Sequence, residues 1–245
     1  MRSVKVWDLP TRIFHWVLVA SILLAYFTSS GHPRGFLFAL HLIGGYSVVL
    51  LLVFRLIWGV FGGEHARFAS FLRGWTAVKE HALRLAALAP GRNLGHNAIG
   101  GWMIVLMLGT LLAIVTTGLL AQGITGGAGP LSRALPAVLL KPVGAVHQWL
   151  GTAILVLAGL HVAGVLAECL LSRENLVRAM ITGQKYVEAA RDAYAVPRMR
   201  AVLLLLLLAF LGGIMVGLTR LPPPVPDAAR VGLASEPAKL RADAD

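Results

Sequence analysis

The residues best able to do chemistry are two histidines within one apolar stretch, residues 142–170. His147 and His161 lie fourteen residues apart in a segment long enough to cross a bilayer, which takes ~20 apolar residues. In a helix they would be roughly 21 Å apart along the axis and within about 40° of the same face. Because an imidazole in hydrocarbon is costly without a partner, the pair predicts a ligand at each of two membrane depths.

The composition places the chain among helical membrane proteins. Of its 245 residues, 57% are hydrophobic and 13% charged, and the mean hydropathy is +0.76, which excludes a soluble globular domain. We attribute the net charge of +11 to basic cytoplasmic loops and expect no nucleic-acid partner. The single cysteine, Cys169, excludes an internal disulfide, a thiolate-held iron–sulfur cluster and c-type haem attachment, and we expect it to pack near a helix end.

Five apolar segments predict five transmembrane spans, at about residues 12–29, 40–61, 99–120, 143–170 and 201–218. The first is interpreted as a retained span because Asp8, Pro10 and aromatic residues precede or enter it and no signal-peptide cleavage pattern follows. Asp8 or Thr11 is expected to cap it, and Asn97 the third span. We predict a core domain over 1–186, a linker and fifth span over 187–218, and a flexible tail over 219–245.

Basic residues predict the orientation. They are concentrated in the N-terminal arm and in 62–98 and 171–200, whereas the opposite loops hold only Arg34, Arg133 and Lys141. The positive-inside rule puts the N-terminus in the cytoplasm and, after five crossings of a bacterial inner membrane, the C-terminus in the periplasm. Segment 74–88 is expected to be a helix in the cytoplasmic interface, and a short amphipathic helix is expected to start at Ser172 and end at Gly183.

The intramembrane histidines pair by depth in this topology. His15 and His161 fall near the cytoplasmic face, and His41 and His147 near the periplasmic face. We therefore predict two sites with two imidazoles each. The other histidines are expected to be solvated or to cap helices: His32, His65, His81 and His96.

Two facing imidazoles at each level favour b-type haem, whose macrocycle fills the equatorial positions. Zinc would gather three or four protein ligands in one place. Gly45 and Gly151 each follow a proposed ligand by one helical turn, where a missing side chain would let a flat porphyrin approach the backbone. The chain is thus predicted to be an all-α integral membrane protein, with a four-helix bundle holding two bis-histidine haems and a fifth C-terminal helix.

Arg55 lies fourteen residues after His41, at the depth of the proposed cytoplasmic haem. It is predicted to bind a propionate of that haem, with an arginine that snorkels to the interface as the alternative. Glu168 lies two turns beyond His161, where a solvated carboxylate is expected and proton exchange with a quinol is the alternative.

Four stretches resemble the bacterial cytochrome b561 family, which includes the b-type cytochrome subunit of nickel–iron hydrogenases. They are VWDLPTRIFHW at 6–16, FRLIWGVFGGEHARFASFLRG at 54–74, GHNAIGGWM at 95–103 and SRENLVRAMITGQK at 172–185. The resemblance covers about residues 4–186. It implies a four-helix core with two b haems on His15, His41, His147 and His161, and electron transfer between membrane quinone and a redox partner. The fifth span and the tail depart from the four-span pattern of short family members.

We therefore expect a membrane-embedded dihaem electron carrier with no catalytic residues of its own. It would connect quinone with a periplasmic redox protein, such as a c-type cytochrome, or with a catalytic subunit. Two alternatives remain open. One is an oxidase of superoxide or another small reductant coupled to quinone, using a pocket lined by Arg34, Arg133 and Lys141. The other is a haem-bearing membrane anchor of a hydrogenase or dehydrogenase.

Overall fold

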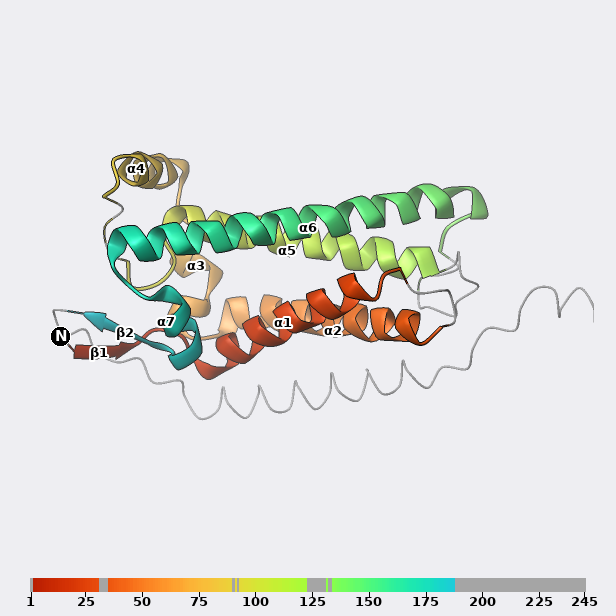
Figure 1. Cartoon of the computed structure of the whole chain (residues 1–245), viewed down its shortest axis with the longest axis horizontal. Coiled ribbons are helices and arrows are strands. Elements are labelled where there is room, and N and C mark those ends of the chain that lie inside the picture. Colours follow the sequence, from red (N-terminus) through yellow and green to blue (C-terminus); the bar gives the residue numbers. More distant parts are fainter. Residues whose placement is uncertain are drawn as a thin grey trace, which may run out of the picture.

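Four long helices run side by side as a bundle (Figure 1). The computed structural model describes residues 2–30, 35–89, 91, 93–122, 131 and 134–187. The bundle consists of α1 (Leu9–Phe27), α2 (Phe36–Phe61), α5 (Ala98–Ala121) and α6 (Ala137–Ser172), each long and apolar enough to cross a membrane. The first four predicted spans are confirmed as helices, and the predicted fifth span and tail lie outside the described residues.

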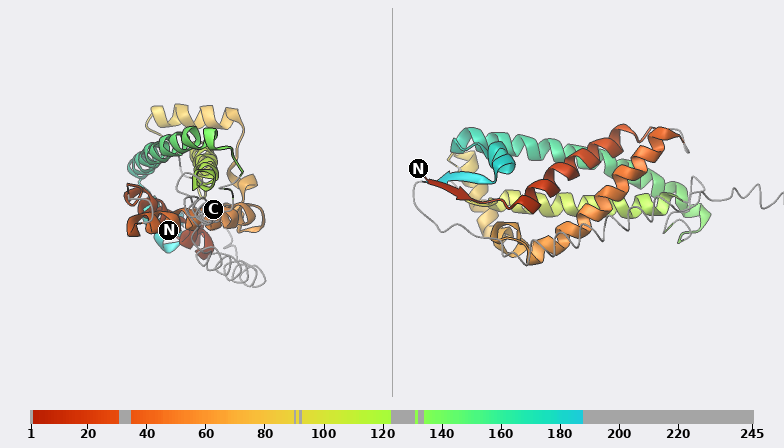
Figure 2. Two further views of the ribbon diagram at one scale, coloured as in Figure 1. Left: turned by 90° about the vertical axis from the view of Figure 1, so that its right-hand side faces the viewer. Right: turned by 90° about the horizontal axis from the view of Figure 1, so that it is seen from below.

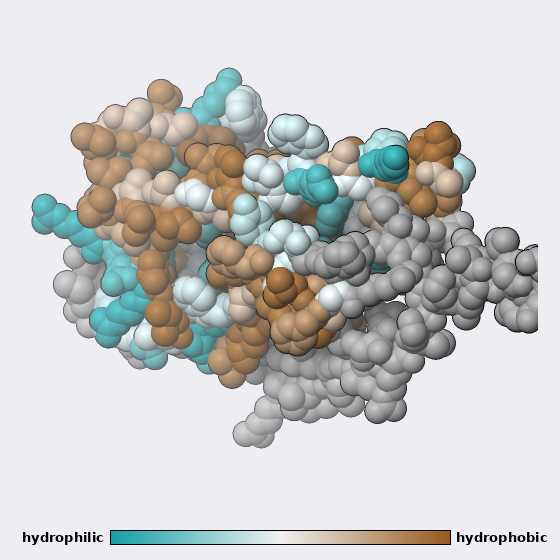
Figure 3. All heavy atoms as spheres, turned by 45° about the vertical axis from the view of Figure 1, so that its right-hand side comes forward, coloured by the Kyte–Doolittle hydropathy of each residue, from teal (hydrophilic) through white to brown (hydrophobic). Residues whose placement is uncertain are grey.

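The bundle packs as two antiparallel pairs, α1 with α2 and α5 with α6, joined through α2 and α5 (Figure 2). Its buried core contains Val48 and Leu52 from α2, Leu111 from α5 and Ile154 from α6. Large apolar side chains also cover the outer faces, for example Leu112, Val156 and Leu160, and brown apolar atoms spread over much of the face in Figure 3. This arrangement suits a bundle surrounded by lipid.

Side chains fix the helix starts where the sequence predicted them. Asp8 caps α1, accepting a hydrogen bond from the Thr11 backbone N–H at 2.9 Å, and Asn97 caps α5 by accepting one from Gly100 at 2.6 Å. Gly44 allows α1 and α2 to approach closely, because a Cβ there would lie 2.9 Å from the backbone nitrogen of Ala25.

A small cap covers the end of the bundle that holds the N-terminus, called here the proximal end; the opposite end is the distal end. In this cap, the strands β1 (Arg2–Lys5) and β2 (Gln184–Val187) pair antiparallel, with Val4 opposite Lys185. The predicted all-α class fits the bundle, and these two short strands are an addition that the sequence analysis did not predict. They form because the backbone N–H groups of Val6 and Trp7 bond to the carbonyl of Gly183, which aligns the flanking segments.

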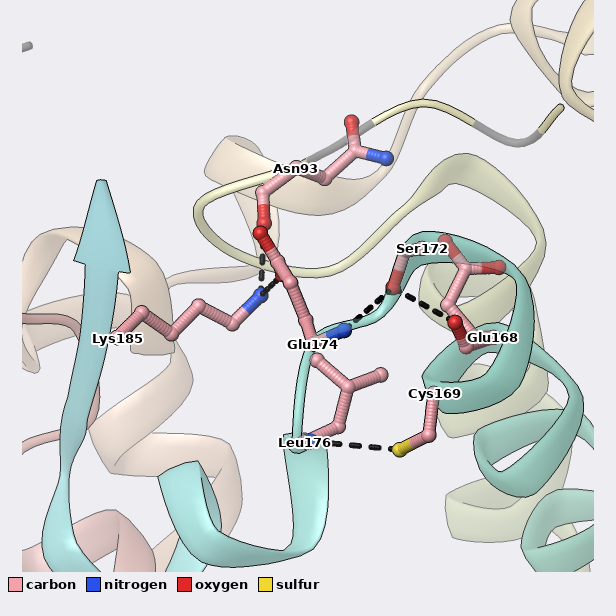
Figure 4. A network of polar contacts seen from close by, with 7 residues as sticks. All are labelled: Asn93, Glu168, Cys169, Ser172, Glu174, Leu176 and Lys185. Carbon is pink, nitrogen blue, oxygen red and sulfur yellow. Dashed lines mark hydrogen bonds and ion pairs between the residues drawn. The ribbon is translucent and has the colours of Figure 1, made fainter. Parts of the chain in front are cut away.

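The predicted helix after the fourth span is shorter than expected. It is α7 (Leu176–Thr182), which is capped by Asn175, while Ser172 still belongs to α6. The Ser172 hydroxyl donates to the Glu168 carbonyl and accepts from the Glu174 N–H, so it helps to end α6 and does not start α7 (Figure 4). The predicted end at Gly183 is confirmed, at φ 81°.

Helix α4 (Trp75–Ala86) lies across the bundle axis at the proximal end (Figure 2). The short helices η1 (Glu64–Ala66) and α3 (Phe68–Phe71) lead into it from α2. Trp75 and Leu83 are about two-thirds exposed, with relative accessibilities of 68% and 70%. The helix predicted at 74–88 is confirmed, and its place in the membrane interface stays a prediction.

Candidate functional site

The distal histidine pair meets inside the bundle, as its predicted depth required. The rings of His41, from α2, and His147, from α6, have centroids 6.1 Å apart and planes at 88°. Imidazole nitrogens bind transition metals at about 2 Å, so two rings on opposite sides of one metal ion have centroids roughly 6 Å apart. The spacing fits two axial ligands of one iron.

Backbone carbonyls hold both distal rings by their Nδ1 atoms. The Nδ1 of His41 lies 2.7 Å from the carbonyl oxygen of Ala25, and that of His147 lies 3.0 Å from the carbonyl oxygen of Ile114. A carbonyl oxygen only accepts hydrogen bonds, so each Nδ1 carries the proton and donates it. Each Nε2 then keeps its lone pair for a metal, an arrangement common among metal-binding histidines.

Two residues of α5 also hold His147, and sequence reasoning did not identify them. The Thr117 hydroxyl lies 3.3 Å from its Nδ1, and a Cβ at Gly118 would lie 2.8 Å from its Cε1. Gly118 therefore makes room for the imidazole ring. In the sequence, Gly118 is simply a glycine within an apolar helix, and this does not indicate which side chain packs against it.

The proximal pair is His15, from α1, and His161, from α6. Their pairing stays a prediction. The ring of His15 packs edge-on against Trp16, with centroids 4.9 Å apart. Its Nδ1 is buried and has no hydrogen-bond partner among the described residues, unlike the anchored Nδ1 atoms of the distal pair.

The two glycines predicted to face the porphyrin border open space. A Cβ built at Gly45 or at Gly151 would meet no atom within 4 Å. This space is compatible with a flat group beside each backbone, and the role of both glycines stays a prediction.

Arg55 is buried in the proximal half of the bundle, with 4% of its surface exposed. Its guanidinium carbon lies 4.7 Å from the ring centroid of Phe68 and 5.9 Å from that of Phe71. A Cβ at Gly59 would lie 2.0 Å from the Phe68 ring, so this glycine lets the ring lie close to α2. Such burial does not fit an arginine that snorkels into water.

Two histidines expected to be solvated are instead shielded. His81 is 7% exposed, and its Nε2 lies 3.7 Å from a carboxylate oxygen of Glu168, which is 8% exposed. The expectation of a solvated Glu168 is therefore also wrong. The cause is the contact between α4 and the proximal end of α6, where the two side chains shield each other from solvent.

His96 is the second misjudged histidine. Its ring centroid lies 4.5 Å from that of Trp7 and 4.9 Å from that of Phe71, and its buried Nδ1 has no hydrogen-bond partner in the described ranges. Burial, followed by the charge of Arg55, lowers the pKa of the His96 imidazole to about 3, so the ring is neutral at physiological pH. The feature of the sequence that could have indicated this burial is the position of His96 directly before Asn97, the residue that caps α5. His65 is partly buried against Trp7, and His32 lies outside the described residues.

A polar network ties the end of α6 to the cap (Figure 4). The buried ammonium of Lys185 donates to the Asn93 carbonyl at 2.7 Å and pairs with the Glu174 carboxylate at 3.3 Å. The Cys169 sulfur accepts a hydrogen bond from the Leu176 N–H at 3.3 Å, so this thiol helps to position α7 in addition to packing near a helix end.

Comparison with known proteins agrees with this arrangement. The family described as prokaryotic cytochrome b561 matches residues 6–183, which is most of the chain. The chain belongs to the prokaryotic cytochrome b561 family. This cytochrome is thus a multi-pass membrane protein of a b-type haem family that serves membrane electron transfer.

Several curated relatives of this b561-family cytochrome are each named as a probable Ni/Fe-hydrogenase B-type cytochrome subunit. One from Rhizobium leguminosarum bv. viciae is 24% identical, over 78% of this chain and 92% of the relative. Another, from Azotobacter chroococcum mcd 1, is 26% identical over 74% of this chain and 88% of the relative. The one from Rhodobacter capsulatus is 25% identical, over 75% and 81%. No solved structure matches the chain.

Proposed function

We propose that this b561-family cytochrome transfers electrons across the membrane through two b haems. One is held between His41 and His147, and the other between His15 and His161. The observation that supports this best is the distal pair, whose rings lie 6.1 Å apart with each Nδ1 anchored on a carbonyl. A b haem supplies a centre that takes up and releases one electron at a time.

The residues of the chain hold and tune the two centres. Helix α6 provides one ligand to each, roughly 21 Å apart along its axis at ~1.5 Å per residue, so a single element sets their separation. Hydrogen bonds from the Nδ1 atoms of His41 and His147 fix the ring orientation and raise the basicity of Nε2. Arg55 places a buried positive charge in the proximal half, where it would bind a haem propionate.

The direction across the membrane follows from the basic residues. The proximal end lies in the cytoplasm of a bacterial cell and the distal haem near the periplasmic face of the inner membrane. Membrane quinone is one redox partner. The other is a periplasmic redox protein, such as a c-type cytochrome, or a catalytic subunit.

A second candidate is the haem-bearing membrane subunit of a hydrogenase or related dehydrogenase. The names of the curated relatives favour it. Mild-detergent purification with mass spectrometry separates the candidates, because this role requires a large catalytic subunit to co-purify. The superoxide alternative gains no support from the structure, since Arg34 and Arg133 lie outside the described residues.

Haem content of single-histidine variants tests the proposal. We expect His41→Ala and His147→Ala to have the same spectrum and roughly half the haem, because each removes one ligand of the distal site. His15→Ala and His161→Ala should share a different spectrum. Fewer than two non-covalent haems per wild-type chain would contradict the proposal, and so would a His41 variant that resembles the His161 variant.

A further inference from the structure

Arg55 is a buried cation without a bonded anion. Its Nη1 has no hydrogen-bond partner among the described residues, and 4% of the side chain is exposed. The carboxylate that attracts it electrostatically is Asp8. That carboxylate is already occupied, because it accepts hydrogen bonds from the Thr11 N–H at 2.9 Å, the Trp58 indole at 3.1 Å and the Gly63 N–H at 3.3 Å. The guanidinium therefore lacks a close anionic partner among the described residues. A buried charge in this state is costly.

His96 offers a second unused donor at the same place. Its Nδ1 is buried and has no hydrogen-bond partner in the part of the chain that the structure describes, and its ring packs on Phe71, the ring that Arg55 also faces. The imidazole lies within electrostatic range of both Arg55 and the proximal ligand His161. A neutral imidazole can donate one hydrogen bond without adding a second positive charge.

Close packing holds His96 in this position. A Cβ at Gly101 would lie 2.6 Å from the carbonyl oxygen of Phe71, and one at Gly95 would lie 3.2 Å from Nδ1 of His65. Gly101 therefore lets the start of α5 pack closely against α3, and Gly95 lets the loop before α5 pack closely against η1. The ring of His96 is thereby held within electrostatic range of Arg55, from α2, and His161, from α6.

We infer that Arg55 and His96 together form a two-point site for one propionate of the proximal haem, with Arg55 supplying the charge and His96 a neutral hydrogen bond. This inference rests on the proposed function and adds His96 as a haem-binding residue. Among the groups that the proposed function brings into the bundle, a propionate is the anion that satisfies both orphaned donors.

The test is a redox titration that resolves the two haems. Removing the charge in Arg55→Gln disfavours the reduced proximal haem, so its equilibrium constant for reduction should fall by roughly tenfold, about 59 mV for one electron. His96→Phe keeps a ring on Trp7 and Phe71 but removes the donor, and should lower the same constant about threefold. His96→Gln, which retains an N–H donor, should restore most of the wild-type value.

Two controls separate a propionate site from a general effect. Arg73→Gln removes an exposed charge at the same end of the bundle and should leave the potential of the proximal haem unchanged. Reconstitution with haem dimethyl ester, in which the propionates carry no charge, should abolish most of the difference between wild type and Arg55→Gln. A difference that persists with the ester would overturn the inference.

The double variant Arg55→Gln/His96→Phe tests whether both residues act on one group. Its shift should differ from the sum of the two single shifts, as expected for residues that share a partner, whereas simple additivity contradicts a shared propionate. Haem content separates failure of the proposed function from failure of the propionate site. Wild-type protein that binds no haem would refute the proposed function. Two bound haems with a proximal potential that does not respond to the substitutions would refute the propionate site alone.

Discussion

In the proposed distal site, the ring of His147 has to be oriented before it can bind a metal, and one glycine contributes to this orientation. Gly118 lies against the ring of His147, where a Cβ would come within 2.8 Å of Cε1. The ring has little room to yield, because its Nδ1 is bonded to the Ile114 carbonyl. The position of this imidazole therefore depends on a residue that binds nothing itself.

Gly118→Ala should lose most of the distal haem and keep the proximal one, because the new methyl group displaces the His147 ring. The haem-to-protein ratio and the spectrum of the purified variant measure this. Gly109→Ala is the matched control, since it lies in the same helix and its Cβ would meet nothing within 4 Å. A Gly118→Ala protein with two normal haems would contradict the steric argument.

Gly45→Ala and Gly151→Ala test where the porphyrin lies. A Cβ at either position meets no protein atom, and alanine favours a helix over glycine by about 1 kcal/mol, so the haem-free protein should not lose stability. We expect weaker binding of the distal haem alone, measured by haem loss to a competing apoprotein. Unchanged haem retention in both variants would mean that the flat group lies on another face of α2 and α6.

At the scale of the elements, a buried pair fastens α4 to the bundle. His81, from α4, and Glu168, from α6, face each other across 3.7 Å, and both are nearly excluded from solvent. The outer side of α4 carries exposed Trp75 and Leu83. Helix α4 thus has an apolar outer side and a polar contact on its inner side.

Glu168→Ala should loosen α4, because it removes the carboxylate that faces the buried Nε2 of His81, at a cost of about 1 kcal/mol. Hydrogen exchange measured by mass spectrometry should show faster exchange of α4 amides. The double variant with His81→Ala should cost less than the sum of the two single changes. Glu80→Ala is the control, since its pair with Arg84 is exposed and should contribute under about 0.5 kcal/mol.

At the scale of the whole molecule, the bundle has two chemically different ends. The proximal end carries the β1–β2 cap, α4 and α7, while the distal end in the described residues consists of the ends of the four long helices (Figure 1). The basic residues of the sequence predict that the proximal end lies in the cytoplasm.

Site-directed labelling measures this orientation. With Cys169→Ser as background, Lys5→Cys at the proximal end and Lys141→Cys at the distal end place one exposed thiol on each side. A membrane-impermeant maleimide should label Lys141→Cys in intact spheroplasts and Lys5→Cys only after permeabilisation. The opposite pattern would reverse the orientation and place the proximal haem near the periplasm.

Deletion of residues 221–245 should leave both haems in place. The segment is rich in proline and mixed charges, with little apolar sequence that could join a packed core. Haem content of the inserted, truncated protein measures the outcome. Loss of a haem would mean that the tail contributes to a site, whereas loss of partner activity alone would assign it to docking.

The sequence by itself determined the four long helices and the pairing of their histidines. Apolar runs of this length have one stable form in a bilayer, because a helix satisfies every backbone hydrogen bond within itself. The direction of each crossing then sets the depth of each histidine. The pairs His41 with His147 and His15 with His161 were predicted from chain order and depth. The structure brings the rings of the first pair together, and the second pair stays a prediction.

Only the tertiary structure decided what surrounds these histidines. Gly118 meets His147, His96 packs on Phe71, and Glu168 meets His81, each through a contact between segments that are distant in sequence. Helical periodicity describes one element at a time, so it gives the face of a residue without the neighbour on the opposing element. The β1–β2 cap escaped prediction for the same reason, because its two short strands are defined by pairing between the ends of the core domain.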